Sequence, residues 1–289
     1  MKKVLTIAGS DSGGGAGIQA DIKTISALGC YAASVITAVT AQNTLGVQAV
    51  HPVPPEIVSA QIKAVLDDIG ADAIKIGMLF SADTIHAVAK TLNFKLANET
   101  ASLNSKLSTL NYTTPVVLDP VMVSTSGHRL MEEDAIEALT TELFPLATLI
   151  TPNIPEAEVL LGSPITDLPS AAKQLAERYK VSVLLKAGHQ VPYSPTPLPP
   201  YTQHQLTDIL YNYEEARTYA YPHPRVDTRN THGTGCTLSS AIASELAKGH
   251  ELSEAIGLAT QYLERALESG KNQEIGHGFG PVDHFFAQK

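Results

Sequence analysis

The chain has 289 residues, of which 44% are hydrophobic and 17% are charged, and its formal net charge is −9 at pH 7. Soluble domains usually carry about 25% charged residues, so this composition predicts a large buried core, or a surface partly covered by another subunit. Binding to nucleic acid needs clustered Lys and Arg side chains, and the sequence has no such cluster, which argues against nucleic acid as a partner.

The first predicted element is a short apolar strand at residues 4–8. This stretch is too short for a signal peptide or a membrane span. We therefore expect a cytoplasmic protein without a membrane partner. The two cysteines, Cys30 and Cys236, form neither a metal-binding spacing nor a disulfide framework.

A glycine-rich loop at residues 9–17, GSDSGGGAG, joins this strand to a helix predicted at 18–28. The loop satisfies a loosened dinucleotide fingerprint, G-x-G-x-x-A. However, no acidic residue lies between Asp21 and Glu56, where that fold would need one for the ribose. The sequence also lacks a P-loop motif. The loop therefore predicts either a tight turn or the close approach of a small ligand to the backbone.

Strand-like and helix-like segments then alternate along the chain. Strands are predicted at residues 34–39, 73–77, 116–119, 148–151 and 182–186, and helices at 56–69 and 81–92. Because these strands are apolar on both faces, they are typical of a parallel sheet that helices cover on both sides. The sequence therefore predicts an α/β fold, with residues 1–289 forming a single domain.

Polar residues follow several of the predicted strands. Asp119 ends one strand, Asn153 and Glu156 follow the next, and Lys186 ends another. Ligands of open parallel sheets bind outside the carboxyl ends of strands, and oxygen ligands there suit Mg²⁺ bound to nucleotide phosphates. Two simpler alternatives stay open. Asn153 and Glu156 could cap the following helix, and Lys186 could be an ordinary surface lysine.

Two segments interrupt the alternation. Residues 93–114 are rich in Asn, Ser, Thr and Lys, and form either a surface excursion or a helix extension. Residues 190–205 contain five prolines, and form either a spacer or a cover over a site. Beyond them we predict a strand pair at 206–212 and 217–221, followed by helices at 234–248 and 253–269.

The strongest local motif, NTHGTGCT, occupies residues 230–237 just before a predicted helix. Gly233 and Gly235 allow a sharp turn, and the unpaired amides and positive end of the helix favour an anion such as a phosphoryl group in transfer. Cys236 at the helix start should have a lowered pKa, which makes it a candidate base for a substrate hydroxyl. The alternative is that Gly233, Thr234 and Gly235 only cap a buried helix and Cys236 is a packing residue.

Seven segments occur in one characteristic order: residues 5–21, 41–44, 75–78, 118–122, 150–156, 230–237 and 278–284. Together they resemble the hydroxymethylpyrimidine/phosphomethylpyrimidine kinases of the ribokinase-like superfamily. The resemblance implies a three-layer sandwich with a central, mostly parallel sheet. It also implies phosphorylation, with ATP and Mg²⁺, of a hydroxymethylpyrimidine and then of its monophosphate in thiamine biosynthesis. A homodimer is expected.

The resemblance also implies roles for individual residues. The transfer site should comprise Gly233, Thr234, Gly235 and the base Cys236. The pyrimidine should contact Gly9, Asp21, Gln42, Met78 and Val121. The nucleotide phosphates should lie near Asp119, Asn153, Glu156 and Lys186. Of these, Asp119 and Glu156 should hold Mg²⁺.

The chain departs from the family pattern at a few positions, and two rival functions also stay open. Ala187 replaces a usual glycine, and the segments 93–114 and 190–205 are atypical, which puts the nucleotide-side lid and the dimer contacts in doubt. A pyridoxal kinase shares the fold and the glycine loop, although Gln42 favours a pyrimidine. A non-catalytic ligand-binding module is the rival from another class, and the complete set of transfer residues argues against it.

Overall fold

The computed structural model describes residues 1–103, 114–122, 131, 134–188 and 205–288. The prolines of the segment 190–205 and residues 104–113 of the segment 93–114 lie outside the described residues. The sequence left two alternatives for the start of the latter segment. The helix α3 (Ala82–Leu103) runs through it, so the helix extension is confirmed as far as residue 103.

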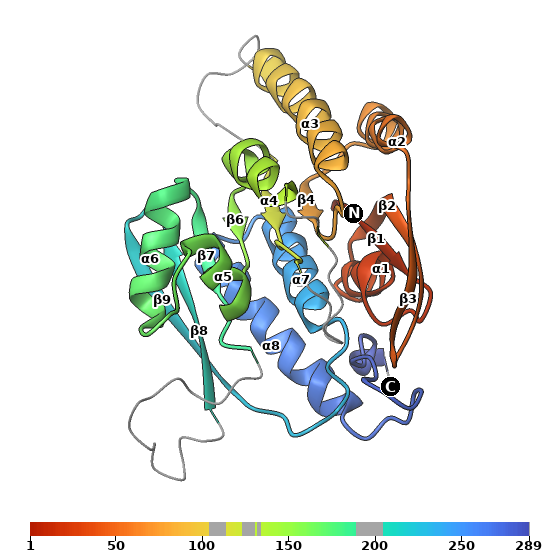
Figure 1. The fold of residues 1–289 in the computed structure, drawn as a ribbon, viewed down its shortest axis with the longest axis vertical. Coiled ribbons are helices and arrows are strands. Elements are labelled where there is room, and N and C mark those ends of the chain that lie inside the picture. Colours follow the sequence, from red (N-terminus) through yellow and green to blue (C-terminus); the bar gives the residue numbers. More distant parts are fainter. Residues whose placement is uncertain (104–113, 123–130, 132–133, 189–204, 289) are drawn as a thin grey trace.

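Within the described residues, nine strands form one sheet in the order β3-β2-β1-β4-β5-β6-β7-β8-β9 (Figure 1). The central strands are parallel: β1 (Lys3–Asp11), β2 (Tyr31–Asn43), β4 (Ala73–Ile76), β5 (Val116–Leu118), β6 (Leu149–Ile150) and β7 (Ser182–Leu185). Antiparallel strands form both edges: β3 (Gly46–Pro52) on one side, β8 (Gln205–Asn212) and β9 (Arg217–Pro224) on the other.

Helices cover both faces of this sheet. One hydrophobic core joins the sheet to α2 (Pro55–Asp68), α3, α4 (Ala135–Ala138), α5 (Ile154–Leu161) and α6 (Leu168–Tyr179). The other core joins it to α1 (Gly17–Ala27), α7 (Thr234–Lys248) and α8 (Leu252–Gly270). Successive strand residues point to opposite faces, so two buried faces explain the continuous apolar runs in the sequence. The predicted three-layer α/β fold is confirmed.

Neighbouring residues of β4 illustrate this arrangement. Ile74 and Ile76 belong to the core under α2 and α3, whereas Ala73 belongs to the core under α7. Lys75 shares the face of Ala73 and is fully buried there. A polar residue is thus built into the α1–α7 side of the sheet.

The hairpin of β2 and β3 is longer than the sequence predicted. The strand expected at 34–39 extends from Tyr31 to Asn43, and β3 was not predicted. Most residues of β3 are exposed or half-buried, so this strand lacks the apolar pattern used to recognise the others. The hairpin tip contacts a C-terminal loop, because the backbone N–H of Phe279 donates to the Thr44 carbonyl at 2.9 Å.

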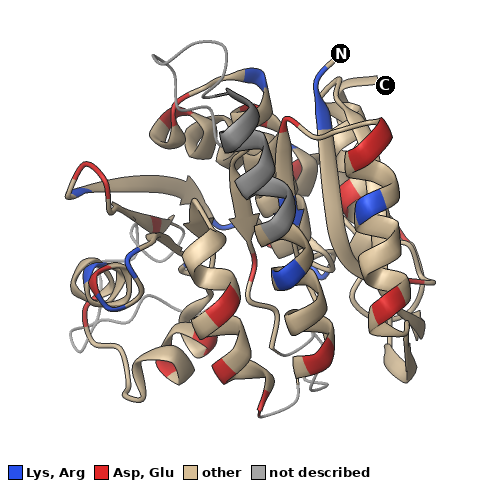
Figure 2. Ribbon diagram, turned by 90° about the horizontal axis from the view of Figure 1, so that it is seen from above, with Lys and Arg blue, Asp and Glu red and all other residues tan. Residues whose placement is uncertain are grey.

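Charged side chains are spread over this scaffold. Figure 2 shows Lys and Arg scattered over helices and loops, with Asp and Glu between them. None of the helices in the described ranges combines the length and hydrophobicity of a transmembrane segment.

Candidate active site

A cavity of about 730 Å³ opens at the carboxyl ends of the parallel strands. The loops after β1, β4, β5 and β7 line it, together with the first residues of α5 and α7. Of the thirteen residues that the sequence analysis assigned to the site, twelve line this cavity, and Asp21 is the exception. Segments far apart in the chain therefore meet where an open parallel sheet places its ligands.

The start of α7 is shaped by Gly233, which adopts a left-handed conformation with φ of 81°. A Cβ atom at this position would lie 1.9 Å from the carbonyl oxygen of Gly15, so only glycine fits. No described side chain caps the helix. The Thr234 N–H donates to the Thr231 carbonyl at 3.3 Å, and Thr234, Gly235 and Cys236 line the cavity. Gly233 itself is buried, whereas these three residues are half-buried, so this turn begins a largely buried helix and also faces the cavity. Its role in binding an anion stays a prediction.

Gly235 brings this helix start close to the charged groups at the end of β5. A Cβ atom there would lie 3.2 Å from Asp119 Oδ2 and 3.4 Å from Lys186 Nζ. The short distances show that the glycine loop, Asp119 and Lys186 surround one small space. A phosphoryl group in that space would meet backbone N–H groups, a cation and a carboxylate that can hold a metal ion.

Cys236 is half-buried and lines the cavity, but its electrostatics differ from the prediction. Burial raises the pKa of its thiol to about 11, although Lys75 and a hydrogen bond from the Gly17 backbone N–H oppose this shift. The expected lowering of the pKa is therefore wrong. Loss of water around the sulfur outweighs the favourable end of the helix, because desolvation penalises the charged form.

Asp119 and Lys186 form an ion pair beside the glycine loop. Lys186 Nζ lies 2.8 Å from Asp119 Oδ1, and the Thr151 hydroxyl donates to the same oxygen at 3.0 Å. Burial lowers the pKa of Lys186, but Asp119 and Glu156 outweigh it and raise the pKa above its usual value. Lys186 is thus a largely buried, charged residue, and the surface-lysine alternative is wrong.

Glu156 and Asn153 form a capping box at the start of α5. The Asn153 side chain accepts from the Glu156 N–H at 2.9 Å, and Glu156 Oε2 accepts from the Asn153 N–H at 2.9 Å. The capping alternative is therefore confirmed, and both residues also line the cavity. Burial, followed by repulsion from Asp119, raises the pKa of Glu156 to about 7, against the attraction of Lys186.

These groups fit a hard divalent cation. Asp119 Oδ2 is not used by Lys186 or Thr151, which both contact Oδ1, and Glu156 lies close enough for the two carboxylates to repel each other. Mg²⁺ is commonly held by one or two carboxylates together with substrate phosphates. Within the described part of the chain, no group of three or more His, Cys, Asp or Glu side chains forms a self-sufficient metal site.

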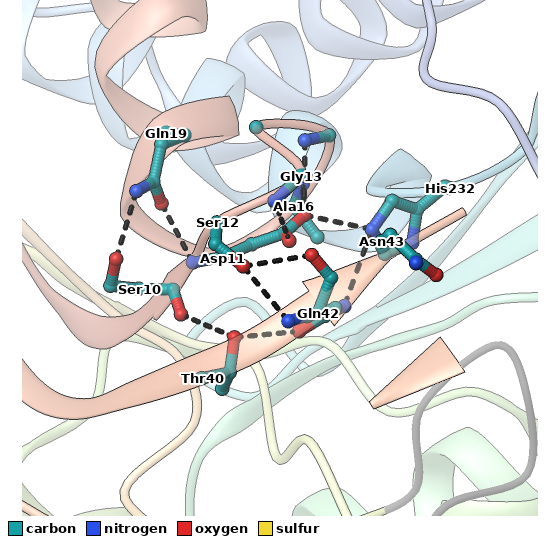
Figure 3. A network of polar contacts seen from close by, with 12 residues as sticks. Ser10, Asp11, Ser12, Gly13, Ala16, Gln19, Thr40, Gln42, Asn43 and His232 are labelled. Carbon is teal, nitrogen blue, oxygen red and sulfur yellow. Dashed lines mark hydrogen bonds and ion pairs between the residues drawn. The ribbon is translucent and has the colours of Figure 1, made fainter. Parts of the chain in front are cut away.

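The other side of the cavity contains a network of neutral and charged hydrogen bonds centred on Asp11 (Figure 3). Its carboxylate accepts the backbone N–H groups of Gly13, Gly15 and Ala16 at 2.8–3.0 Å. His232 Nε2 lies 2.9 Å from Asp11 Oδ2. Burial raises the pKa of Asp11, but the hydrogen bonds from His232 and these amides lower it below the usual value. The ionised carboxylate therefore closes the glycine-rich loop.

Gln42 lies at the edge of this network. Its side-chain amide is placed between the Thr40 hydroxyl, at 3.1 Å from Oε1, and His232 Nε2, at 3.4 Å from Nε2 (Figure 3). Because an amide offers a donor and an acceptor, a side chain fixed in this way can read a ring that carries both.

Gly9, Met78 and Val121 complete this side of the cavity. A Cβ atom at Gly9 would lie 2.3 Å from the terminal methyl carbon of Met78, so the two residues pack as closely as a glycine permits. Val121 packs against a small core formed by Met78 and Ala38. The predicted apolar lining of the ligand site is therefore brought together.

Asp21 does not reach the cavity, and its predicted contact with the pyrimidine is corrected. It is fully buried in α1, and its two carboxylate oxygens are each 2.9 Å from Lys75 Nζ. The same two oxygens also accept hydrogen bonds from the hydroxyl groups of Thr6 and Ser240. The sequence shows that Asp21 lies in the first helix, but the helical register alone does not show that it faces the sheet.

Asp11 and His232 lie in two of the sequence motifs, but neither residue was predicted to have a role. The sequence did contain a signal that could have identified Asp11. An acidic residue at the end of a strand is followed by several glycines, whose backbone N–H groups need an acceptor. At the far end of the cavity, Asp208 accepts the Ala187 N–H at 2.8 Å and lies 3.5 Å from His223. No sequence motif marked this end.

The parallel sheet, the uncapped glycine start of α7 and the neighbouring carboxylates and lysine define a ribokinase-like phosphotransferase. The chain belongs to the phosphomethylpyrimidine kinase family, whose sequence model matches residues 11–283. The predicted resemblance is confirmed.

Individual relatives agree with this assignment. The hydroxymethylpyrimidine/phosphomethylpyrimidine kinase of Rhizobium meliloti is 45% identical, over 97% of this chain and 96% of that protein. The thiamine biosynthesis bifunctional protein ThiED of Geobacter sulfurreducens is 46% identical over 98% of this chain, which spans only 52% of that protein. The structure is also similar to an ADP complex of Bacillus subtilis pyridoxal kinase, with a TM-score of 0.79, 33% identity, and coverage of 100% of this chain and 99% of that one.

Proposed function

We propose that this protein transfers the γ-phosphoryl group of ATP to 4-amino-5-hydroxymethyl-2-methylpyrimidine, and then phosphorylates the monophosphate to the diphosphate, in thiamine biosynthesis. The observation that carries the proposal is one cavity that holds Gln42 at one side and Asp119, Glu156 and Lys186 at the other, with the start of α7 between them. The kinase name of the Rhizobium meliloti relative supports the same reaction, and the thiamine biosynthesis name of the Geobacter sulfurreducens relative supports the pathway.

In this proposal the pyrimidine ring is held by Gln42 between Gly9, Met78 and Val121, which line that side of the cavity. This places a hydroxymethyl group towards Cys236, which takes the hydroxyl proton in its thiolate form. The oxygen then bonds to the γ-phosphorus as the bond to the leaving ADP oxygen breaks. The amides of the Gly233–Gly235 loop stabilise the charge on the phosphoryl oxygens.

On the nucleotide side, Asp119 and Glu156 are proposed to hold Mg²⁺, with Asn153 nearby. The bound ion supplies positive charge against the nucleotide phosphates. Lys186 is already paired with Asp119, and we propose that it orients the same phosphates. Both carboxylates need to be ionised for this task, and the pKa of about 7 for Glu156 means that ion binding drives its deprotonation near neutral pH.

The test is the release of ADP by the wild-type protein and by Cys236→Ala. General bases contribute about 10²–10⁴-fold, so the variant should lose that much turnover while it binds the pyrimidine almost as well. Unchanged turnover would contradict the role of Cys236. Binding of pyrimidine without any ADP release, by either protein, would instead support a non-catalytic ligand-binding module.

Pyridoxal is the second candidate substrate, because a structurally similar protein is a pyridoxal kinase. Gln42 favours the pyrimidine, since its amide can pair with a ring that has both donor and acceptor groups. ADP release with hydroxymethylpyrimidine, its monophosphate and pyridoxal at equal concentrations separates the two. A larger kcat/KM for pyridoxal would overturn the proposed substrate.

We further propose a single catalytic domain over residues 1–289 that forms a homodimer in the cytoplasm. One continuous sheet through the described strands supports the first point. The exposed apolar residues Leu45 and Val39, on the hairpin at the sheet edge, support the second. Light scattering of the purified protein and cell fractionation test the dimer and the location.

A further inference from the structure

The proposed chemistry leaves one buried ion pair unused. Lys75 on β4 and Asp21 on α1 are both fully buried, and Lys75 Nζ lies 2.9 Å from each oxygen of Asp21. Removing two charges from water costs free energy that their attraction does not reliably return, so a buried ion pair is weak evidence for stability. The position of the pair in the fold indicates another role.

The pair lies directly under the start of α7. Asp21 Oδ1 accepts the Ser240 hydroxyl at 2.7 Å, and Asp21 Oδ2 accepts the Thr6 hydroxyl at 2.6 Å. Ser240 follows Cys236 by four residues on α7, so the two side chains share one face of the helix. The ion pair is therefore fixed one helical turn below the sulfur of Cys236.

The Lys75 side chain extends towards the carboxyl end of the sheet, where the cavity lies. Gly77 is two residues further along and faces the same side as Lys75. A Cβ atom at Gly77 would lie 2.7 Å from Lys75 Nζ. The missing side chain of Gly77 thus provides the space that the ammonium group occupies.

We propose that Lys75, held by Asp21 and accommodated by Gly77, is a positioning residue whose positive charge stabilises the thiolate of Cys236. The inference rests on the proposed role of Cys236 as the base and names the group that makes this role possible. The thiolate takes the hydroxyl proton, so the O–H bond breaks as the S–H bond forms. Lys75 keeps its own proton throughout.

The charges around Cys236 agree with this assignment. The groups that act on it are Lys75 from β4, Asp21 from α1 and Asp119 from the end of β5, together with the Gly17 backbone N–H. After burial, Lys75 has the largest effect on the pKa of Cys236 and lowers it, whereas both aspartates raise it. Burial lowers the pKa of Lys75, but Asp21, Cys236 and Asp119 together raise it above its usual value, so Lys75 stays charged.

The experiment measures the thiol directly, without turnover. The sequence has two cysteines, so a Cys30→Ser background leaves Cys236 as the sole thiol. The rate of alkylation by iodoacetamide is followed against pH in EDTA, with no nucleotide or pyrimidine. In this background, Lys75→Met should raise the apparent pKa of Cys236 by one unit or more. At a fixed pH below that pKa, alkylation should then be about ten times slower. Asp21→Asn should shift it downwards.

Two further variants separate charge from structure. Lys75→Arg keeps the charge, so the midpoint of the alkylation rate against pH should return towards the parent value. Thr6→Val removes a hydrogen bond to Asp21 without changing any charge, so it should leave this midpoint in place. In turnover, K75M should lower kcat, leave the KM for the pyrimidine unchanged, and recover part of the loss as pH rises.

The opposite signs make the inference falsifiable. A midpoint unchanged in both K75M and D21N, or shifted in the same direction by both, overturns it. If K75M does not fold, the neutral pair D21N/K75M takes its place and should still raise the midpoint, because Lys75 acts on Cys236 more strongly than Asp21 does. Turnover retained by C236A would overturn the base, while the thiol titration would still report on Lys75.

Discussion

The two sides of the cavity are organised by different forces. On the side of Gln42, an ionised Asp11 is satisfied by three backbone amides and His232, so its carboxylate is fully hydrogen-bonded within the protein. On the side of Asp119, two carboxylates compete for Lys186 and one of them has its pKa raised to about 7. The first side is complete without a ligand, whereas the second still requires positive charge. Under the proposed function, the first side is a preformed site for the uncharged ring, and the second is a site that the nucleotide and its cation complete.

The largest expected effect concerns the incomplete side. Asp119→Asn removes a proposed cation ligand and the charged partner of Lys186. Mutation of residues that only support the ligands of a metal site lowers metal affinity or activity by about 10–100-fold. Loss of a ligand should cost more, so kcat should fall by more than roughly 100-fold. The dissociation constant of the pyrimidine, measured by calorimetry without nucleotide, should stay within a factor of two. Equal losses on both sides would break the comparison.

The complementary change is His232→Gln, on the complete side. It removes a hydrogen bond to a charged carboxylate, worth about 1.5–3 kcal/mol, and the ring that lies against the Gln42 amide. The KM for the pyrimidine should rise about tenfold or more, while the KM for ATP stays unchanged. His284→Gln, which alters a buried histidine that does not line the cavity, is the control. A rise in the KM for ATP alone would reverse the assignment of the two sides.

The loop between the two sides can be tested through stability. Gly233→Ala forces a left-handed alanine against the Gly15 carbonyl, whereas Gly249→Ala, at the other end of α7, has a similar φ and open space. A left-handed alanine costs about 1–2 kcal/mol, which is the loss expected for G249A. G233A should lose clearly more. Urea denaturation measures both, and equal losses would show that the contact with Gly15 is unimportant.

The last prediction concerns the pH dependence of stability. Because the pKa of Glu156 is raised to about 7 in the folded protein, the folded state binds this proton more tightly than the unfolded state. This contribution to the free energy of unfolding is present at acid pH and is lost as pH rises from about 4.5 to 7. Glu156→Gln should remove this slope. Saturating Mg²⁺ should weaken it in the wild type, and a slope kept by E156Q would assign the proton to another group.

Much of this site could be predicted from the sequence, and the two failures within the site share one cause. The cavity could be located from the polar residues that follow successive strands and from the glycine loop before α7. Parallel strands bring their carboxyl ends together, so these segments meet at one edge of the sheet. The sequence did not show that Asp21 faces Lys75 instead of the ligand, or that burial would raise the pKa of Cys236. Both depend on how much water is excluded by packing from distant segments. The strand β3 was missed because it is held by backbone pairing with β2 and has little apolar pattern.

The contact between the hairpin tip and the C-terminal loop has a consequence for how the pocket forms. Gly278 and Phe279 donate backbone hydrogen bonds to Thr44, two residues from Gln42, and His232 donates to the carbonyl of Gly280. The wall that carries Gln42 is therefore fastened by residues more than 230 positions later in the chain. During synthesis on the ribosome, the early strands can assemble, but this wall stays unfastened until residue 280 has emerged. A chain that ended before residue 278 would therefore keep Gln42 but lose the contacts that hold its wall in place.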